Sequence, residues 1–195
     1  MNDLTRRGFI LGSATLASYG LLVGVQRACF SAFADDQQDE SNQGAVTIVQ
    51  FADDGTRIGA KSVAKLRRAI KEWKKLLTPG QYEVTRRAAT EFAYSGDLYD
   101  QHAPGLYRCV CCGNALFDSG SKFDSGTGWP SFWKPIASEN VYERTDTSYG
   151  VVCKEVKCTL CDAHLGHVFT DGPEPTGLRY CMNSAALRFL PRSNS

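Results

Sequence analysis

Two Cys-x-x-Cys pairs constrain the fold of this chain more than any other feature. Cys109 and Cys112 form the first pair, Cys158 and Cys161 form the second, and 45 residues lie between them. Zinc prefers four thiolates in a tetrahedron, and each pair presents two thiolates from one tight turn. A single ion bound by both pairs would clamp two distant segments of the chain together. We therefore expect one structural zinc ion held by Cys109, Cys112, Cys158 and Cys161.

Two other arrangements of these cysteines are open. In an exported protein the pairs could instead form disulfide bonds. Cys158 and Cys161 could also bind a metal together with His164 and His167, which would leave the first pair without a role and crowd four ligands into ten residues. Cys111 lies between two expected ligands and is not expected to be a ligand itself.

The first 34 residues have the pattern of an export signal. Arg6 and Arg7 follow polar residues and precede Phe9, which resembles the twin-arginine signal, and an uncharged stretch runs from residue 8 to residue 25. A small-x-small pattern at residues 32–34 suits a signal peptidase. We expect a cleaved signal peptide at residues 1–34 and a periplasmic protein, with a retained membrane anchor as the alternative. Because this route carries folded proteins, the thiols would meet zinc before export, which favours the metal over disulfides.

The rest of the chain suits one compact domain after a short spacer. Residues 35–44 are acidic and polar, which predicts a disordered spacer. Beyond residue 34 the chain has 19 basic and 20 acidic residues, a balance that gives no support to nucleic-acid binding. Seven cysteines remain there, an odd number that disulfide pairing alone does not explain.

Residues 45–71 are expected to form an N-terminal extension, made of a short hairpin and the start of a helix. Residues 46–51 have strand composition, Asp53-Asp54-Gly55 predicts a turn, and residues 57–60 are expected to return as a second strand. Apolar residues at steps of three and four predict a helix from about Ser62, as its cap, to Leu77. The basic residues between 61 and 75 are interpreted as its solvated face. Another short helix is expected at residues 81–87, and short β-branched or aromatic runs after Leu106 predict antiparallel β structure.

Cys181 is the candidate nucleophile. Taken alone, a cysteine is most often a small buried hydrophobic residue. Here Arg179 precedes it by two residues, Asn183 follows it by two, and His164 and His167 lie upstream. A reactive thiol needs cationic or donor groups nearby, and a reducible oxygen needs an acid to protonate it. The spacing indicates that such groups are available, not that they meet.

Four ordered motifs resemble the methionine-R-sulfoxide reductase family. They are KFDSGTGWPSF at residues 122–132, CTLCDAHLGHVF at 158–169, DGPEPTG at 171–177 and RYCMNSAAL at 179–187. KKLLTP at residues 74–79 and TE at 90–91 extend the similarity upstream. The resemblance therefore covers roughly residues 72–189, most of the chain beyond the predicted signal.

The resemblance implies a mainly β domain at residues 72–190, with two antiparallel sheets, short N-terminal helices and a structural four-cysteine zinc site away from the chemistry. It implies that Cys181 attacks the sulfoxide sulfur and becomes a sulfenic acid as methionine is released. His164 and His167 would bind and protonate the oxygen, and Arg179 and Asn183 would organise the thiolate. The indole of Trp129 would contact the sulfoxide methyl, unless it is a core tryptophan.

One departure from the family concerns recycling of the enzyme. Many relatives have a resolving cysteine where this chain has Thr127, which leaves Cys111 and Cys153 as other candidates. We expect direct reduction of Cys181 by a thioredoxin-like protein or a small thiol. The expected enzyme is a monomer that repairs methionine-R-sulfoxide in oxidised exported proteins, or as the free amino acid. A zinc-ribbon interaction module and a dithiol–disulfide oxidoreductase are the alternatives from other classes.

Overall fold

The computed structural model describes residues 44–147 and 153–192. The predicted signal peptide at residues 1–34, with Arg6 and Arg7, lies outside these residues, as does the predicted spacer up to residue 43. Within the described part of the chain, no helix has the length and apolar character that crossing a membrane requires.

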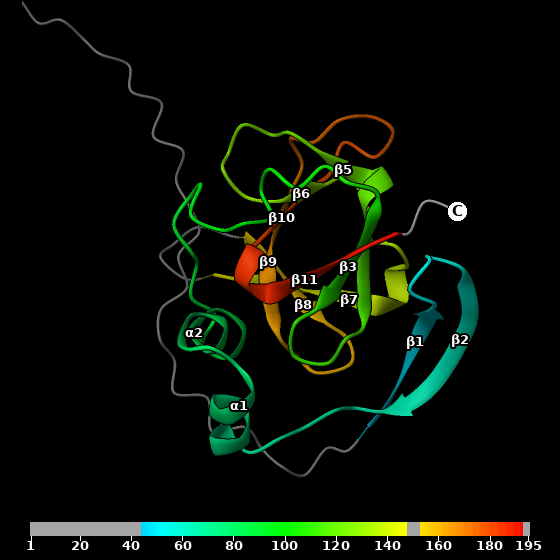
Figure 1. The fold of residues 1–195 in the computed structure, drawn as a ribbon, viewed down its shortest axis with the longest axis vertical. Coiled ribbons are helices and arrows are strands. Elements are labelled where there is room, and N and C mark those ends of the chain that lie inside the picture. The colour runs from blue at the N-terminus through cyan, green and yellow to red at the C-terminus, as the bar shows by residue number, and fades with distance from the viewer. Residues whose placement is uncertain (1–43, 148–152, 193–195) are drawn as a thin grey trace, which may run out of the picture.

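The described chain begins with a β-hairpin. Strand β1 (Ala45–Phe51) pairs antiparallel with β2 (Arg57–Ala64), and the turn expected at residues 53–55 joins them (Figure 1). Asp54 Oδ1 accepts the backbone N–H of Thr56, and Gly55 has a φ of 90°, which residues with a Cβ rarely adopt. The predicted hairpin is confirmed, but its second strand runs on to Ala64.

The helix predicted from Ser62 is wrong over its first half. Ser62 pairs with Thr47 in the hairpin, and helix α1 (Ile70–Leu76) begins only after Ala69. Glu72 caps this helix, because its carboxylate accepts the backbone N–H of Ala69. The first turn of a helix is costly to form, whereas residues 62–64 complete a ladder of hydrogen bonds with β1. The apolar spacing of the sequence does not reveal that strand partner.

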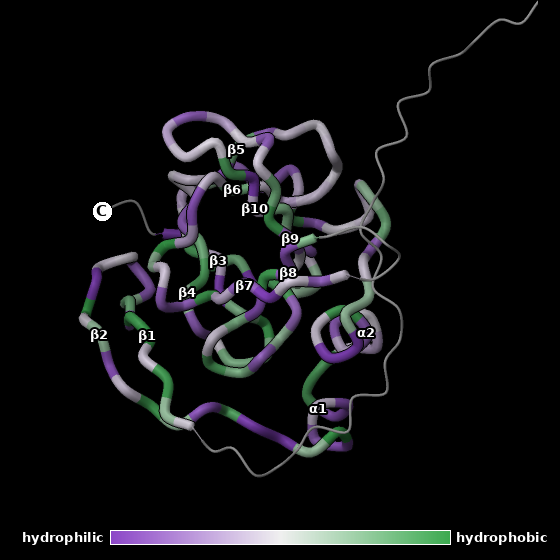
Figure 2. Tube along the Cα trace, turned by 180° about the vertical axis from the view of Figure 1, so that it is seen from behind, coloured by the Kyte–Doolittle hydropathy of each residue, from purple (hydrophilic) through white to green (hydrophobic). Residues whose placement is uncertain are grey.

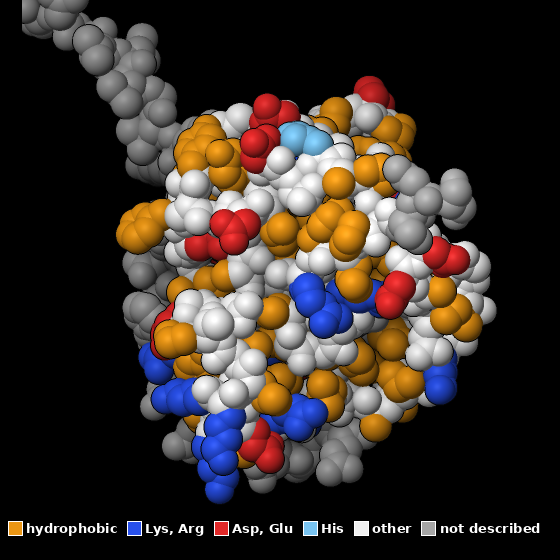
Figure 3. All heavy atoms as spheres, viewed as in Figure 1, with side chains coloured by type: hydrophobic (Ala, Val, Ile, Leu, Met, Phe, Trp, Pro, Cys, Tyr) orange, Lys and Arg blue, Asp and Glu red, His pale blue; other side chains and the backbone are white. Residues whose placement is uncertain are grey.

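A second helix, α2 (Pro79–Arg87), confirms the short helix expected at residues 81–87. Thr78 Oγ1 accepts the backbone N–H of Gln81, and Gln81 Oε1 accepts that of Thr78, so the two residues form a reciprocal cap. Trp73, Leu77 and Tyr82 form a small buried cluster between the two helices. The lysines of α1 are exposed, which agrees with a solvated face, and lysine and arginine side chains gather at the lower left of Figure 3.

Two antiparallel sheets form the body of the protein (Figures 1 and 2). One has three strands in the order β11-β3-β4, and the other has six in the order β5-β6-β10-β9-β8-β7. The helices and the hairpin lie on opposite sides of this body in both views. The strands are β3 (Gly105–Cys109), β4 (Ala115–Asp118), β5 (Lys122–Phe123), β6 (Ser131–Phe132), β7 (Val141–Asp146), β8 (Cys153–Cys158), β9 (His164–Phe169), β10 (Arg179–Met182) and β11 (Leu187–Pro191), with short 3-10 helices η1 (Ser119–Ser121), η2 (Ser138–Asn140) and η4 (Ser184–Ala186).

Aromatic rings join the two sheets in the core. Phe117 of β4 stacks on Phe132 of β6 with ring centroids 4.4 Å apart, and Tyr107 of β3 meets Phe132 edge to face at 4.9 Å. Tyr180 of β10 also packs against Phe117. Because side chains alternate along a strand, burial of Tyr180 on this face turns its neighbour Cys181 to the other face. The expected fold class, mainly β with two antiparallel sheets and short N-terminal helices, is confirmed.

Two side chains of the body hold the hairpin in place. Asn140 is fully buried; its Oδ1 accepts the N–H of Val49, and its Nδ2 donates to the carbonyls of Val49 and Ala115 at 2.8 and 2.7 Å. Arg108 donates from Nη2 to the carbonyl of Phe51 at 2.9 Å. The extension is therefore a folded part of the structure, attached through specific hydrogen bonds.

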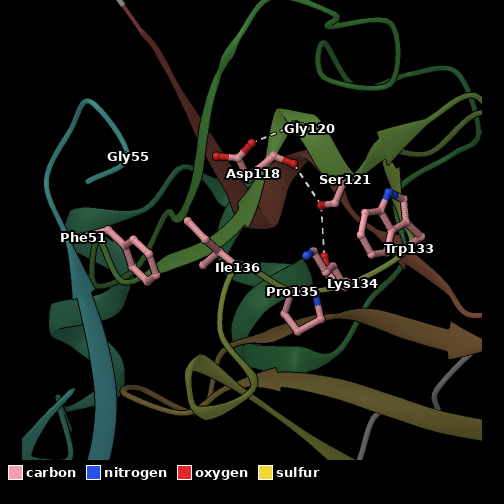
Figure 4. Close-up of a pocket in the computed structure, with 9 residues that line it drawn as sticks. All are labelled: Phe51, Gly55, Asp118, Gly120, Ser121, Trp133, Lys134, Pro135 and Ile136. Atoms are coloured by element: carbon pink, nitrogen blue, oxygen red, sulfur yellow. Dashed lines mark hydrogen bonds between the residues drawn. The ribbon is translucent and has the colours of Figure 1, made fainter. Parts of the chain in front are cut away.

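A cavity of about 330 Å³ lies where the hairpin meets the body. Figure 4 shows Phe51 and Gly55 of the hairpin on one side and the loop of residues 133–136 on the other. Ser121 Oγ hydrogen-bonds to the carbonyls of Asp118 and Lys134 across its wall. Neither Cys181 nor either of the two β9 histidines lines this cavity, so the candidate active site lies elsewhere.

Candidate active site and metal centre

The four cysteines of the two pairs meet at one point. Cys109 Sγ lies 3.7 Å from Cys161 Sγ, Cys112 Sγ lies 3.6 Å from Cys158 Sγ, and all four sulfurs lie within 4.8 Å of one another. Thiolates about 2.3 Å from a tetrahedral ion stand about 3.8 Å apart. All four are free cysteines, so the alternative of two disulfide bonds is not what the structure contains. The cluster fits one metal ion.

The two pairs have the same backbone conformation. Gly113, which follows the first pair, has a φ of 76° and donates its N–H to the carbonyl of Cys109. Asp162 follows the second pair with a φ of 58° and donates in the same way to Cys158. Each turn therefore directs both of its sulfurs to one side, and the centre joins the end of β3 to the turn between β8 and β9. Cys111 is not part of the cluster; it packs against the residues buried under α1 and α2.

A row of side chains crosses the six-stranded sheet at Cys181. Strand β10 lies between β6 and β9 (Figure 1). Cys181 of β10 pairs with Ser131 of β6 on one side and with His167 of β9 on the other. His167 in turn pairs with Glu155 of β8. Directly opposite residues in antiparallel strands point to the same face of the sheet. Ser131, Cys181, His167 and Glu155 therefore share one face.

A β-bulge brings the second histidine to this face. Val156 pairs with Gly166 and Lys157 pairs with His164, so β9 carries one more residue than β8 at this point. Side chains alternate between the two faces of a regular strand, so residues three positions apart point to opposite faces. A bulge inserts one extra residue between them, and as a result both side chains point to the same face. The rings of His164 and His167 consequently lie 5.4 Å apart.

The close contact of β9 with β10 requires a glycine in the bulge. Gly166 has a φ of 155°, and a Cβ built on it would overlap the carbonyl oxygen of Cys181. Any side chain would push the two strands apart. Gly166 thus fixes how closely the histidines approach the strand that carries Cys181.

Each histidine has an acidic residue close to it. His164 Nδ1 donates to Glu155 Oε1 at 2.8 Å, and His167 Nε2 lies 3.6 Å from Asp146 Oδ2, within reach of its charge but too far for a hydrogen bond. Burial opposes the charge of Glu155, but the hydrogen bond from His164 and the charge of Lys157 hold the pKa of its carboxyl below the usual value. Burial, followed by repulsion from His164, lowers the pKa of His167. The sequence alone did not identify Glu155 or Asp146, because neither stands near a histidine in a recognisable motif.

The Nε2 atoms of both histidines are buried and have no hydrogen-bond partner among the described residues. Buried polar atoms are normally satisfied, so an unsatisfied pair at one place needs an explanation. An oxygen atom held between the rings would satisfy one or both of them. The two histidines therefore suit a polar oxygen on the face that Cys181 shares.

The surroundings of Cys181 act on its thiol in opposite directions. Burial raises the pKa of Cys181 above its ordinary value, while the charge of Arg179 and hydrogen bonds from Thr127 and Arg179 act to lower it. Arg179 is held in place by Asp171, to which Nε and Nη2 donate at 2.9 and 2.8 Å. Thr127 also bonds to Ser125, whose Oγ lies 2.8 Å from its hydroxyl. The thiol is therefore mostly protonated until something further stabilises its anion.

Asn183 lies beside this site but is bonded elsewhere. It is buried; its Oδ1 accepts the backbone N–H of Glu91 at 3.0 Å, and its Nδ2 donates to the carbonyl of Leu165 at 3.1 Å. The structure thus brings Cys181, Arg179, His164 and His167 to one face and places Asn183 as a link between β9, the end of β10 and residue 91.

Trp129 is half-buried rather than a core residue, and its indole Nε1 donates to the carbonyl of Glu91 at 3.1 Å. Glu91, like Glu155 and Asp146, was not singled out by the sequence. Its only signal was membership of the Thr90-Glu91 segment, which resembles the family but suggests no role.

The comparisons with known proteins agree with this geometry. A family model described as a SelR domain matches residues 77–191. The chain belongs to the SelR family. It is 57% identical over 118 residues to the peptide methionine sulfoxide reductase MsrB of Herminiimonas arsenicoxydans, covering 60% of this chain and 86% of that protein. It is 50% identical over 132 residues to the protein of the same name from Pseudomonas aeruginosa strain UCBPP-PA14, covering 68% of this chain and 100% of the relative.

A third relative with that name, from Thiobacillus denitrificans, is 54% identical over 121 residues, which cover 62% of this chain and 92% of the relative. The SelR match begins at residue 77, after the hairpin and α1. All the residues of the metal centre and of the Cys181 site lie inside the SelR match.

Proposed function

We propose that this SelR protein reduces methionine-R-sulfoxide in oxidised proteins through a sulfenic acid on Cys181. That the chain is a peptide-methionine (R)-S-oxide reductase follows from its family and from 50–57% identity to reductases of that kind. The observation that supports the mechanism is Cys181 on β10 directly opposite His167, on the face that carries two buried histidine nitrogens without a hydrogen-bond partner among the described residues.

In the first step the Cys181 sulfur attacks the sulfoxide sulfur and forms a transient S–S bond. The protonated oxygen then transfers to the Cys181 sulfur, and both the substrate S–O bond and the transient S–S bond break. The substrate leaves as the thioether, reduced by two electrons, and Cys181 becomes Cys–SOH. The substrate oxygen would lie against the orphaned Nε2 atoms of His164 and His167, which supply the hydrogen bonds and the proton that the departing oxygen needs. Arg179 stabilises the thiolate, and the Trp129 indole offers an apolar contact to the sulfoxide methyl.

His164 is the better candidate for the proton donor. Its Nδ1 is held by the carboxylate of Glu155, which fixes the ring and leaves Nε2 for the substrate. The pKa of His167 is lowered by burial, so this ring is mostly neutral at neutral pH and suits a hydrogen-bonding role.

In the second step a thiol from a reductant condenses with the sulfenic acid and releases water, and a second thiol then frees Cys181 and leaves a disulfide on the reductant. Thr127 offers no sulfur. Cys153 is disulfide-bonded in the structure. It also lies on β8, two strand spacings or about 10 Å from β10, which exceeds the Cα separation of about 7 Å that a disulfide with Cys181 tolerates. Cys111 packs beneath α1 and α2. These positions favour direct reduction by a thioredoxin-like protein or a small thiol.

The metal is proposed to be one structural zinc ion. The four free cysteines supply a tetrathiolate of the right size, which is the ligand set that zinc prefers. Bound there, the ion would hold the three-stranded sheet to the turn between β8 and β9. The sequence around Arg6 and Arg7 resembles a twin-arginine signal, and this resemblance supports a periplasmic location, where the enzyme would repair oxidised exported proteins.

Turnover of separated R and S epimers of a methionine sulfoxide peptide tests the activity. The R epimer should be reduced and the S epimer left nearly untouched, and Cys181→Ser should abolish turnover because a hydroxyl is a far poorer nucleophile than a thiolate. Comparable rates on both epimers, or a Cys181→Ser rate within about tenfold of the unmodified chain, would refute the assignment.

A single turnover without reductant tests the intermediate. Mass spectrometry should find Cys181 as a sulfenic acid that dimedone traps. A disulfide between Cys181 and either Cys153 or Cys111 in that sample would replace direct reduction with an internal route.

A further inference from the structure

Glu91 makes four hydrogen bonds, three with the residues that follow β10 and one with Trp129. Its carboxylate accepts the backbone N–H of Ser184 at 2.5 Å through Oε1 and that of Ala185 at 2.9 Å through Oε2. Its own backbone N–H donates to Asn183 Oδ1 at 3.0 Å, and its carbonyl accepts from Trp129 Nε1 at 3.1 Å. One residue thus contacts both the segment that follows Cys181 and the tryptophan proposed to contact the substrate.

The side chain and the backbone of Glu91 have different tasks. The carboxylate fastens residue 91 to the backbone of Ser184 and Ala185, which follow directly after the catalytic strand. The backbone of Glu91, held in this way, orients the carboxamide of Asn183 and the indole of Trp129. Asn183 continues the connection, since it also bonds to the carbonyl of Leu165 between the two histidines.

The surrounding segment, which we call the arm (residues 88–99), fits this place closely. A Cβ built on Gly96 would overlap Ser184 Oγ and would lie 2.9 Å from Glu91 Oε1. Tyr94 extends the contact to the Trp129 loop, because its N–H donates to the carbonyl of Gly128 at 2.8 Å and its hydroxyl donates to that of Gly126 at 2.7 Å. The arm is therefore built against both parts of the site at once.

We propose that Glu91 is a positioning residue for the sulfoxide reaction: it sets the indole of Trp129 at the correct distance from Cys181. The inference rests on the proposed function for the identity of the substrate. It assigns to Glu91 no contact with the substrate or with the reacting atoms. A carboxylate suits this arrangement, because each of its two oxygens accepts one N–H group, whereas a carboxamide would place an NH2 donor against one of them.

The Glu91→Gln variant tests the proposal with a change of almost no volume. One of the two N–H groups then faces an NH2 group, the arm loosens, and the indole of Trp129 moves. We expect KM for the R-sulfoxide peptide to rise about tenfold, because misplacing a positioning group by a fraction of an ångström is costly. The alkylation rate of Cys181 should stay within about twofold, since no hydrogen bond to its sulfur is lost. Glu139→Gln, an exposed glutamate on η2, is the matched control and should change neither.

A double-mutant cycle separates positioning from a general loss of stability. If Glu91 acts through Trp129, Glu91→Gln should add little to the KM of a Trp129→Phe chain, whose ring has no N–H to be held. If the rise in KM of the double variant equals the product of the rises in the two single variants, the two residues act independently and the proposal is wrong.

A second readout does not depend on activity. The indole N–H signal of Trp129 in a nitrogen-15 NMR spectrum should shift in Glu91→Gln and exchange faster with water. An unchanged signal in the folded variant would overturn the positioning role even if the enzyme reduces sulfoxides. If the unmodified chain showed no turnover, the proposed function would be refuted. The NMR signal would still test whether Glu91 holds the indole of Trp129 in place.

Discussion

Replacing Thr127 with valine should make Cys181 less reactive at neutral pH. Burial holds the pKa of Cys181 above its ordinary value of 9.0, and the charge of Arg179 and the hydroxyl of Thr127 counteract part of that effect. Because this pKa lies above its ordinary value, the thiol is predominantly protonated at pH 7. Valine keeps the shape of threonine and removes the donor, so the thiolate becomes rarer still.

The size of the effect follows from the hydrogen bond that is lost. A bond to a charged group contributes about 1.5–3 kcal/mol, and the lower end applies because Arg179 remains beside the sulfur. About 1.4 kcal/mol corresponds to a tenfold change in an equilibrium, so the thiolate population at pH 7 should fall about tenfold. The thiolate is the charged form, so loss of a donor raises the pKa, and the reactivity curve should move to higher pH.

The assay is the rate of alkylation of Cys181 by iodoacetamide from about pH 6 upward, followed by mass spectrometry of the peptide that contains it. Thr47→Val, on β1 of the hairpin, is the matched control and should leave the curve in place. The reasoning is wrong if Thr127→Val and the unmodified chain have the same pH dependence, since the hydroxyl would then have no influence on the sulfur.

Two further predictions concern the metal and the predicted export signal. Cys112→Ala should lose the bound zinc, measured by elemental analysis, and should lower the melting temperature, because binding energy at a structural site is folding energy. Cys111→Ala, which removes a thiol outside the group of four, is the control that should keep the zinc, and a Cys112→Ala chain with an unchanged melting temperature would contradict the structural role. Replacing Arg6 and Arg7 together with lysine should leave the precursor in the cytoplasm in a cell-fractionation assay, and undiminished export would show that another route operates.

The cysteine cluster and several local elements could be predicted from local sequence. A Cys-x-x-Cys pair needs only its own turn to present two sulfurs, so Cys109, Cys112, Cys158 and Cys161 were expected to meet, and they do. The turn at Gly55 and the helix α2 were likewise predicted correctly, because turn residues and caps act over three or four positions. The roles of Cys181, His164, His167, Arg179 and Trp129 came from the resemblance to a family and stay predictions until they are tested.

The tertiary structure decided what depends on partners far away in the chain. Residues 62–64 have a helical apolar pattern, but pairing with residues 45–47 made them a strand. The spacing of His164 and His167 would place them on opposite faces of a regular strand, and the bulge at Gly166 brings them together. A sequence pattern shows only how apolar residues are spaced along a short segment. Strand register, by contrast, is fixed by hydrogen bonds and packing between segments that are distant in the chain.

Contacts between distant segments also explain why the sequence did not identify the acidic residues of the site. Glu91 meets Ser184 across 93 positions, and Glu155 meets His164 across a strand pair. The residues next to a glutamate in the sequence do not show whether its side chain makes such a contact or is exposed to solvent. The sequence determined which groups can react and which can bind a metal. Only the folded chain, by bringing β8, β9, β10 and the arm into register, determined which side chains hold those groups in place.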